Sequence, residues 1–311
     1  MTRVLVIGCG VIGMTTALRL RESGVDVHIV TREQPAATTS AVAAAIWWPY
    51  RVAPFERVAA WANHTWDVFA RLADEAPESG VSLVELTYLE AEDGEPPSWL
   101  DHRHQPSQLA TADVPDGFAM GYRARVPMID TPIYLAWLRD RLEANGVNIE
   151  EREIGHLDEL LDEASWLVHC AGLGAREVAR DTTMFPIRGQ VVRVRTPERV
   201  WMVGDTTEPA YVLARADGCI VGGTTDEGVE DLTPSATTTE AILDRCRDLV
   251  PELADAEIIE TRVGLRPGRP AVRLEVEIRG DTRVLHNYGH GGAGFTLSWG
   301  CADEAVALVH G

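Results

Sequence analysis

The chain has 311 residues, 45% of them hydrophobic, and a formal net charge of −20 at pH 7. That length and apolar content suffice for two folded domains, and the acidity argues against nucleic-acid ligands and anionic membranes. All 28 basic residues are arginines, which excludes a Walker lysine, a pyridoxal Schiff base and a lysine general base.

Targeting and redox signals favour a cytoplasmic protein. The chain opens on a core strand, so we expect no secretory signal, and the longest apolar run, residues 41–48, is too short to span a bilayer. The five cysteines are scattered and form no Cys-x-x-Cys pair, which favours reduced thiols. The histidines of residues 101–104 lie in a polar loop without supporting ligands, so we expect no metal site.

The first thirty residues carry a dinucleotide fingerprint. A buried strand (3–7) leads into a glycine turn (8–13), an amphipathic helix that stops at Ser23-Gly24, and a second strand (25–30). In this order the glycines allow a tight turn and close approach of a pyrophosphate, which the helix N-terminus binds. The predicted cofactor contacts are Gly8, Gly10, Val11, Ile12 and Gly13.

The end of the second strand lacks the usual acid for the ribose hydroxyls. Glu33 could serve from slightly further along, or Thr31 could bond the ribose itself. Arg32 could instead bind a 2′-phosphate, which would indicate NADP.

A loop rich in hydroxyls follows, and then an apolar run. Thr38, Thr39 and Ser40 could meet the pyrophosphate, while the run through Ala45, Ile46 and Trp47 could pack on a flat ring. A buried helix edge explains the apolar run equally well, and residue type alone leaves both interpretations open.

The middle of the chain alternates between two kinds of pattern. Thr131-Pro132 begins a helix that Gly146 ends, and a strand over 166–170 leads to Gly172, close to where a cofactor would lie. Residues 191–195 alternate as a strand, 211–213 and 219–223 form a hairpin, and a capping box at Thr237 begins a helix through residue 250.

These patterns predict an α/β fold: a Rossmann-like cofactor domain with an inserted antiparallel-sheet substrate domain. We assign 1–52, 132–190 and 264–311 to the discontinuous cofactor domain, and 53–131 and 191–263 to the substrate domain.

Two blocks near the C-terminus, 264–275 and 286–296, are the most informative. Arg273 stands between Val272 and Leu274, and burying an arginine there is costly unless an anion meets it. The glycine-rich second block opens the last helix with few side chains in the way. Within it, His290 is interpreted as ordering the turn by hydrogen bonds rather than as a general base.

Taken together, the chain resembles a D-amino-acid oxidase over nearly its whole length. The resemblance rests on the residues at 8–13, 42–50, 170–172, 188–190, 264–275 and 286–300, and the last two blocks are the most specific. It implies non-covalently bound FAD, hydride transfer from substrate Cα to the flavin, and release of a 2-oxo acid, ammonia and hydrogen peroxide.

The resemblance also implies particular residue roles. Arg273 would bind the substrate carboxylate, Tyr211 would donate to it, and the Gly292 carbonyl would accept from the substrate amine. The flavin pyrimidine edge would meet the helix start, where the expected contacts are Gly291, Gly292, Ala293, Gly294, Phe295 and Thr296. It further implies that Arg32 lies near the adenosine of FAD, not of NADP.

Thr207 stands where many relatives have a second pocket tyrosine, and Trp48 where many have glutamine. We therefore expect a roomy pocket for neutral and apolar D-amino acids, with O2 as the second substrate.

A D-aspartate oxidase would need a further cation in the pocket, and a glycine- or sarcosine-type oxidase is a more distant alternative. An NAD(P)-dependent dehydrogenase or a non-catalytic nucleotide-binding protein would explain the N-terminus but not the C-terminal blocks. A homodimer is left open.

Overall fold

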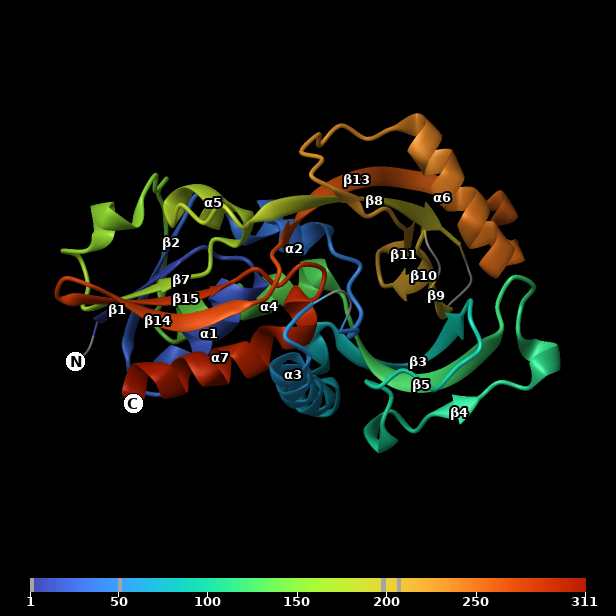
Figure 1. Ribbon diagram of the computed structural model, residues 1–311, viewed down its shortest axis with the longest axis horizontal. Coiled ribbons are helices and arrows are strands. Elements are labelled where there is room, and N and C mark those ends of the chain that lie inside the picture. The colour runs from blue at the N-terminus through green and yellow to red at the C-terminus, as the bar shows by residue number, and fades with distance from the viewer. Residues whose placement is uncertain (1–2, 50–51, 197–199, 206–207) are drawn as a thin grey trace.

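Two sheets lie side by side along the long axis of the molecule, each with helices packed against it (Figure 1). The computed structural model describes residues 3–49, 52–196, 200–205 and 208–311. Thr207, which the pocket-size prediction used, lies outside the described residues. The predicted α/β fold, with one half built on a mainly parallel sheet and a second, largely antiparallel half, is confirmed.

The first sheet has the strand order β14-β15-β7-β1-β2-β6. The strands β1, β2, β6, β7 and β15 pair in parallel, and β14 closes the edge as an antiparallel hairpin with β15. Their bounds are Arg3–Ile7 (β1), Asp26–Thr31 (β2), Asn148–Glu151 (β6), Trp166–His169 (β7), Arg273–Arg279 (β14) and Thr282–Tyr288 (β15). Residues 4–7 of β1 and all four residues of β7 are buried, as strands covered on both faces require.

The second sheet runs β12-β8-β11-β10-β9-β3-β5-β4, and β13 pairs with β8 off this path. Its strands are Val81–Glu90 (β3), Ser107–Gln108 (β4), Met120–Ile129 (β5), Phe185–Arg195 (β8), Trp201–Asp205 (β9), Ala210–Arg215 (β10), Gly218–Gly222 (β11), Asp226–Glu227 (β12) and Glu257–Gly268 (β13). The predicted hairpin is β10 with β11. The domain boundaries expected at 190 and 264 fall inside β8 and β13, which pair along their length.

Seven α-helices lie in the described residues, and three of them pack together beside the first sheet. These are α1 (Val11–Glu22), α3 (Phe55–Glu75) and α7 (Gly294–His310); α7 contacts both of the others. A Cβ on Gly300 would lie 2.4 Å from the Trp61 backbone, so glycine permits the close crossing of α7 and α3. The remaining helices are α2 (Thr39–Val42), α4 (Thr131–Ala144), α5 (Ala175–Val178) and α6 (Ala236–Leu249).

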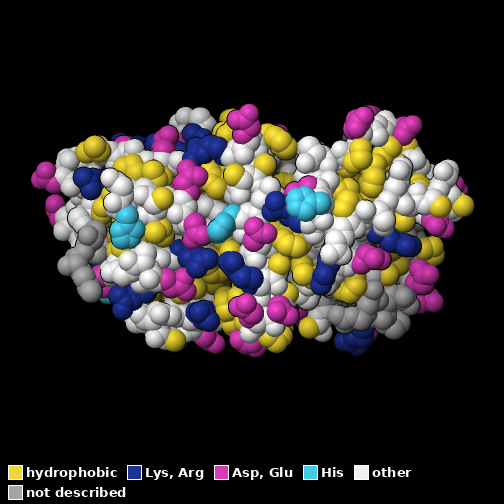
Figure 2. Space-filling model, turned by 90° about the horizontal axis from the view of Figure 1, so that it is seen from below, with side chains coloured by type: hydrophobic (Ala, Val, Ile, Leu, Met, Phe, Trp, Pro, Cys, Tyr) yellow, Lys and Arg dark blue, Asp and Glu magenta, His cyan; other side chains and the backbone are white. Residues whose placement is uncertain are grey.

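The predicted cap of α6 was misplaced by two residues. Ser235 is the N-cap, and its hydroxyl accepts from the Thr238 backbone N–H. Both residues are good N-caps, so local sequence could not choose between Thr237 and Ser235. None of the described helices is long and apolar enough to cross a membrane. On the face shown in Figure 2, arginine and acidic side chains are interspersed among apolar ones.

Candidate active site

A cavity of about 400 Å³ lies where the two sheets meet. On the side of the first sheet, its walls are the loops that follow β1, β2, β6, β7 and β15. On the other side, its walls come from β8, β9, β10 and β13 of the second sheet. The carboxyl ends of parallel strands are where open α/β sheets bind their ligands.

The glycine turn after β1 is shaped by close backbone contacts. Gly8 has a φ of +100°, and a Cβ there would lie 2.7 Å from the Cys170 carbonyl oxygen. A Cβ on Gly13 would lie 1.9 Å from the Gly8 carbonyl oxygen, so only glycine lets α1 approach the turn this closely. Gly10 is the N-cap of α1 and leaves the helix N-terminus open to the cavity. Val11 and Ile12 line the cavity as well, so this part of the predicted set, apart from Gly13 itself, reaches it.

The hydroxyl loop closes over the start of α1. Ser40 Oγ accepts from the Val11 backbone N–H at 3.0 Å. Thr39 Oγ1 donates to the Leu265 carbonyl oxygen at 3.2 Å, which ties the loop to β13. Thr38, Thr39 and Ser40 all line the cavity, as the sequence predicts.

One end of the cavity lies beyond β2 and β6. Thr31, Arg32 and Glu33 line it, and the Thr31 hydroxyl already donates to the Glu33 carbonyl oxygen at 2.8 Å. Arg32 is 60% exposed and pairs with the Glu33 carboxylate. Residues 152–155, after β6, complete this end; they were not predicted, although they follow a strand of the same parallel sheet.

The apolar run after the loop does pack along the cavity, but in strand-like alternation. Ile46 forms a bridge to Met128, and Ala45, Ile46 and Trp48 line the cavity. Trp47 does not: its indole is fully buried on the other side, where Nε1 donates to the Ala62 carbonyl oxygen. Because successive side chains of an extended segment point to opposite sides, the expected contact moves from Trp47 to Trp48.

The glycine-rich turn before α7 forms the other end of the first-sheet wall. Gly291, Gly292, Gly294, Phe295 and Thr296 line the cavity, as does the Gly172 turn opposite. Ala293, the N-cap of α7, is fully buried outside the lining, in contrast to the expectation. The Thr296 hydroxyl bonds both the N–H and the carbonyl oxygen of Trp48, so it fixes the wall rather than facing the cavity alone.

His290 orders the turn by a hydrogen bond, as predicted, but through its backbone. Burial lowers the pKa of its imidazole to about 3, so the ring is neutral and only a weak base. Its Nε2 has no hydrogen-bond partner among the described residues. Its backbone carbonyl accepts from the Ala293 N–H, so the turn is ordered through the main chain.

Tyr211 lines the cavity from β10, as the sequence predicts. Its ring lies against the facing strand β11, where a Cβ on Gly222 would be 2.4 Å from Tyr211 Cζ. A Cβ on Gly223 would lie 2.8 Å from the Tyr211 hydroxyl. The two glycines therefore make the room in which this ring stands.

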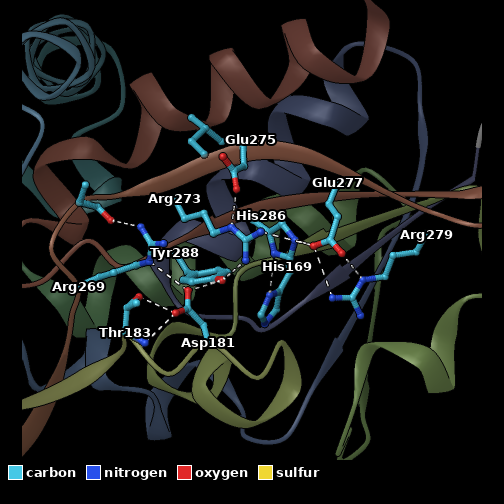
Figure 3. A network of polar contacts seen from close by, with 12 residues as sticks. His169, Asp181, Thr183, Arg269, Arg273, Glu275, Glu277, Arg279, His286 and Tyr288 are labelled. Carbon is cyan, nitrogen blue, oxygen red and sulfur yellow. Dashed lines mark hydrogen bonds and ion pairs between the residues drawn. The ribbon is translucent and has the colours of Figure 1, made fainter.

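Arg273 lies outside the cavity lining, in the polar network of Figure 3. It is the first residue of β14, and its guanidinium donates to the Tyr288 hydroxyl at 2.8 Å and to Glu275 at 2.7 Å. A second carboxylate, of Glu277, lies 3.5 Å away. Its charge is thus met by groups of the protein itself, which answers the burial argument that made Arg273 a ligand candidate.

Arg266, seven positions earlier on β13, does line the cavity. Its guanidinium lies over Gly189, where a Cβ would be 2.4 Å from Nη1, and it donates to the Thr224 carbonyl oxygen at 2.9 Å. No carboxylate pairs with Arg266 in the described part of the chain. Arg266 is therefore the cavity-lining cation at this end with capacity for an anionic ligand.

Only two other arginines among the described residues line the cavity, and both lie at its far end. Arg32 follows β2, and Arg152 follows β6. Three strand spacings separate β2 from β15, or ~14 Å, and four separate β6 from β15, or ~19 Å. A small ligand held between Arg266 and the Gly291 turn is out of their reach. Among the described residues, Trp48, Val203, Pro209 and Leu213 add apolar side chains to the cavity lining on the side of Tyr211.

Comparison with known proteins agrees with this geometry. Residues 3–308 match the family model of FAD dependent oxidoreductases. A D-amino-acid oxidase of Rubrobacter xylanophilus is 48% identical over 99% of this chain and 95% of its own, and one of Streptomyces coelicolor is 42% identical over 98% and 96%. A glycine oxidase of Geobacillus kaustophilus, 19% identical, superposes with a TM-score of 0.81 over 100% of this chain and 95% of its own. The chain belongs to the D-amino-acid oxidase family of FAD-dependent oxidoreductases.

Proposed function

We propose that this protein oxidises neutral and apolar D-amino acids to 2-oxo acids with FAD and O2. The observation that carries the proposal is that Arg266 and Tyr211 line the same cavity as the glycine turn after β1. The relatives' names supply the handedness of the substrate and the class of reaction.

The residues present fit FAD. The Gly8–Gly13 turn and the N-terminus of α1, where Ser40 Oγ accepts from the Val11 N–H, would hold its pyrophosphate. Residues 31–33 and 152–155 would hold the adenosine end. The segment 45–48 and the turn before α7 would hold the flavin ring, whose pyrimidine edge would meet the helix N-terminus.

The carboxylate ligand is Arg266 in this proposal, in place of Arg273. A guanidinium presents a planar fork that suits a carboxylate in bidentate fashion, and Arg266 has no carboxylate partner in the described residues. The Tyr211 hydroxyl would donate to the same carboxylate, and the Gly292 carbonyl would accept from the amine.

In the overall reaction, a D-amino acid, O2 and water give a 2-oxo acid, ammonia and hydrogen peroxide. FAD, when bound, would supply the electron acceptor for oxidation at Cα, with O2 as the final oxidant. The protein's part is to orient Cα and to exclude water. The N-terminus of α7 favours negative charge at the neighbouring edge of the cavity.

The apolar wall beside Tyr211 supports neutral side chains as substrates. A second carboxylate in a desolvated pocket needs its own cation, and Arg266 is the cation among the described lining residues at this end. The guanidinium of Arg215, on the same strand as Tyr211, already has protein partners: it pairs with Asp217 and donates to the Thr131 hydroxyl. This argues against the D-aspartate oxidase alternative.

The test is a peroxide assay across D- and L-amino acids with the wild type and Arg266→Met. We expect kcat/KM for D-leucine, D-valine or D-methionine to exceed that for D-aspartate by at least about tenfold, since an unpaired buried carboxylate costs more than the ~1–3 kcal/mol of an unpaired neutral polar group. Arg266→Met should lose at least about tenfold in kcat/KM while keeping FAD. Preference for D-aspartate would replace this proposal with the D-aspartate oxidase alternative.

The proposal places the protein in the cytoplasm. The support is that all five cysteines are free and buried, which suits a reducing compartment. Fractionation of cells that express the protein would test it. Light scattering would test the homodimer that the sequence leaves open, since a dimer has twice the mass of one chain.

A further inference from the structure

Asp181 lies beside the cavity without lining it, in the loop between α5 and β8. Its side chain is only 7% exposed. Oδ1 accepts from the N–H and the hydroxyl of Thr183, and Oδ2 accepts from Arg269 Nε at 3.1 Å and from the Tyr288 hydroxyl at 2.9 Å (Figure 3). Although burial raises the pKa of Asp181, these hydrogen bonds outweigh it and hold the pKa well below its usual range.

The two donors on Oδ2 belong to the two segments that meet at the substrate end. Arg269 follows Arg266 by three residues, and Tyr288 directly precedes the Gly289–Gly292 turn. The segments also touch each other. The Gly291 N–H donates to the Pro267 carbonyl oxygen at 2.9 Å. The Arg269 stem lies against Gly289, where a Cβ would be 2.8 Å from Arg269 Cδ.

We propose that Asp181 is a positioning residue that sets the spacing between Arg266 and the Gly289–Gly292 turn, acting through Arg269 and Tyr288. The inference rests on the proposed function, because it takes Arg266 as the carboxylate ligand and the turn as a flavin contact. One carboxylate oxygen thereby couples the binding of substrate to the binding of cofactor.

Replacing this carboxylate with an amide exposes the coupling. Asp181→Asn keeps the side-chain shape but leaves one acceptor oxygen for four donors, and it leaves Arg269 without a counter-charge. Arg269 and Tyr288 must then find other partners, and the two segments move with them. Binding of the substrate carboxylate and binding of FAD should both weaken. Loss of Arg266 itself should weaken only the binding of the substrate carboxylate.

The experiment measures FAD Kd by titrating apoprotein, and KM and kcat for D-leucine with saturating FAD. We expect Asp181→Asn to raise both FAD Kd and KM by about fivefold or more, with kcat within about threefold of wild type. Arg266→Met should raise KM and leave FAD Kd within about twofold. The control is Asp158→Asn, which removes a 58% exposed carboxylate. Asp158 pairs with Arg279, at the end of β14 far from Tyr288, so its loss should change neither FAD Kd nor KM.

A double-mutant cycle separates positioning from general loss of stability. In an Arg269→Met, Tyr288→Phe background, Asp181→Asn should add less than about twofold to either constant, because its partners are gone. Effects that simply add would overturn the inference. If Asp181→Asn does not fold, Tyr288→Phe alone serves instead: it removes one hydroxyl and should raise both constants about twofold, and unchanged constants would overturn the inference.

The outcomes also separate the two proposals. If Arg266→Met leaves KM unchanged, the proposed carboxylate ligand is wrong. If Arg266→Met raises KM while Asp181→Asn changes neither KM nor FAD Kd, only the positioning role is wrong.

Discussion

The two glycine-rich ends of this cavity differ in how well the sequence predicts which residues line them. At the N-terminal end, the predicted glycine turn is present, and four of its five predicted contacts line the cavity. At the C-terminal end, the predicted Arg273 lies in a polar network outside the cavity lining, and Arg266 lines the cavity instead.

The difference comes from what each motif depends on. The N-terminal turn depends on backbone contacts. Position 13 must be glycine because a Cβ there would lie only 1.9 Å from the Gly8 carbonyl oxygen. Spacing in the sequence fixes such backbone contacts. The C-terminal site works through side-chain direction, which depends on where β13 ends and β14 begins.

The largest predicted effect is at the backbone motif. Gly13→Ala places a methyl group on the Gly8 carbonyl, so α1 must move away from the turn. We expect FAD Kd to rise by at least about 100-fold, since a cradle shifted by about 1 Å loses several pyrophosphate bonds. Fluorescence titration of the apoprotein measures it. Gly94→Ala, at a position with no atom within 4 Å of the added Cβ, is the matched control. Near-normal affinity in Gly13→Ala would mean that the turn does not hold the cofactor.

A smaller effect is predicted at the end of the cavity where Tyr211 lies. Tyr211→Phe removes one donor to the substrate carboxylate, which is worth about 1–1.5 kcal/mol. KM should rise about fivefold to tenfold with kcat within about threefold, because the hydroxyl binds ground state and transition state alike. Steady-state kinetics with D-leucine measure this. Tyr122→Phe, in the same sheet and bonded to Met120, should leave KM unchanged. An unchanged KM in Tyr211→Phe would remove this residue from the carboxylate site.

The smallest effect concerns the network that holds Arg273. Arg279 and His286 lower the pKa of Glu277 to about 2, against the opposing effect of burial. A depressed carboxyl pKa stabilises the fold above the unfolded value of 4.5, and that contribution is lost as the pH falls from there toward 2. The side chain is 34% exposed, so we discount the contribution to about 1 kcal/mol.

Glu277→Gln should therefore lower the free energy of unfolding at pH 6 and flatten its decline between pH 5 and about 3. Urea denaturation at several pH values measures this, and Glu275→Gln, on a 62% exposed residue, is the control. Turnover with D-leucine should stay normal in both variants. An equally steep decline in Glu277→Gln would show that other groups carry the acid sensitivity.

Much of the fold could be predicted because periodicity reports local structure. The strand-turn-helix start, the β10–β11 hairpin and α4 were all read from it. The same signal was available for α3 and was missed, although Val58, Trp61, Ala62, Thr65 and Phe69 recur at helical spacing on its buried face. That helix packs on α7, a contact between residues far apart in the chain.

Two of the predicted residues that miss the cavity lie in segments that reach it: Trp48 lines the cavity in place of Trp47, and Arg266 in place of Arg273. For Trp47, a one-residue change of phase in an extended segment reverses which side chain faces the cavity. Pairing partners such as Met128 for Ile46 set that phase, and they are distant in sequence. One feature of the sequence could have pointed to Arg266: Gly189, on the paired strand β8, leaves room for its guanidinium.

The most direct test of the central claim compares Arg266→Met with Arg273→Met in kcat/KM for D-leucine, each saturated with FAD. The structure predicts a loss of at least about tenfold in Arg266→Met, because the substrate carboxylate loses its charged partner. It predicts kcat/KM within about twofold of wild type in Arg273→Met, with any cost appearing as lowered thermal stability. A large loss in Arg273→Met with near-normal kinetics in Arg266→Met would contradict the account.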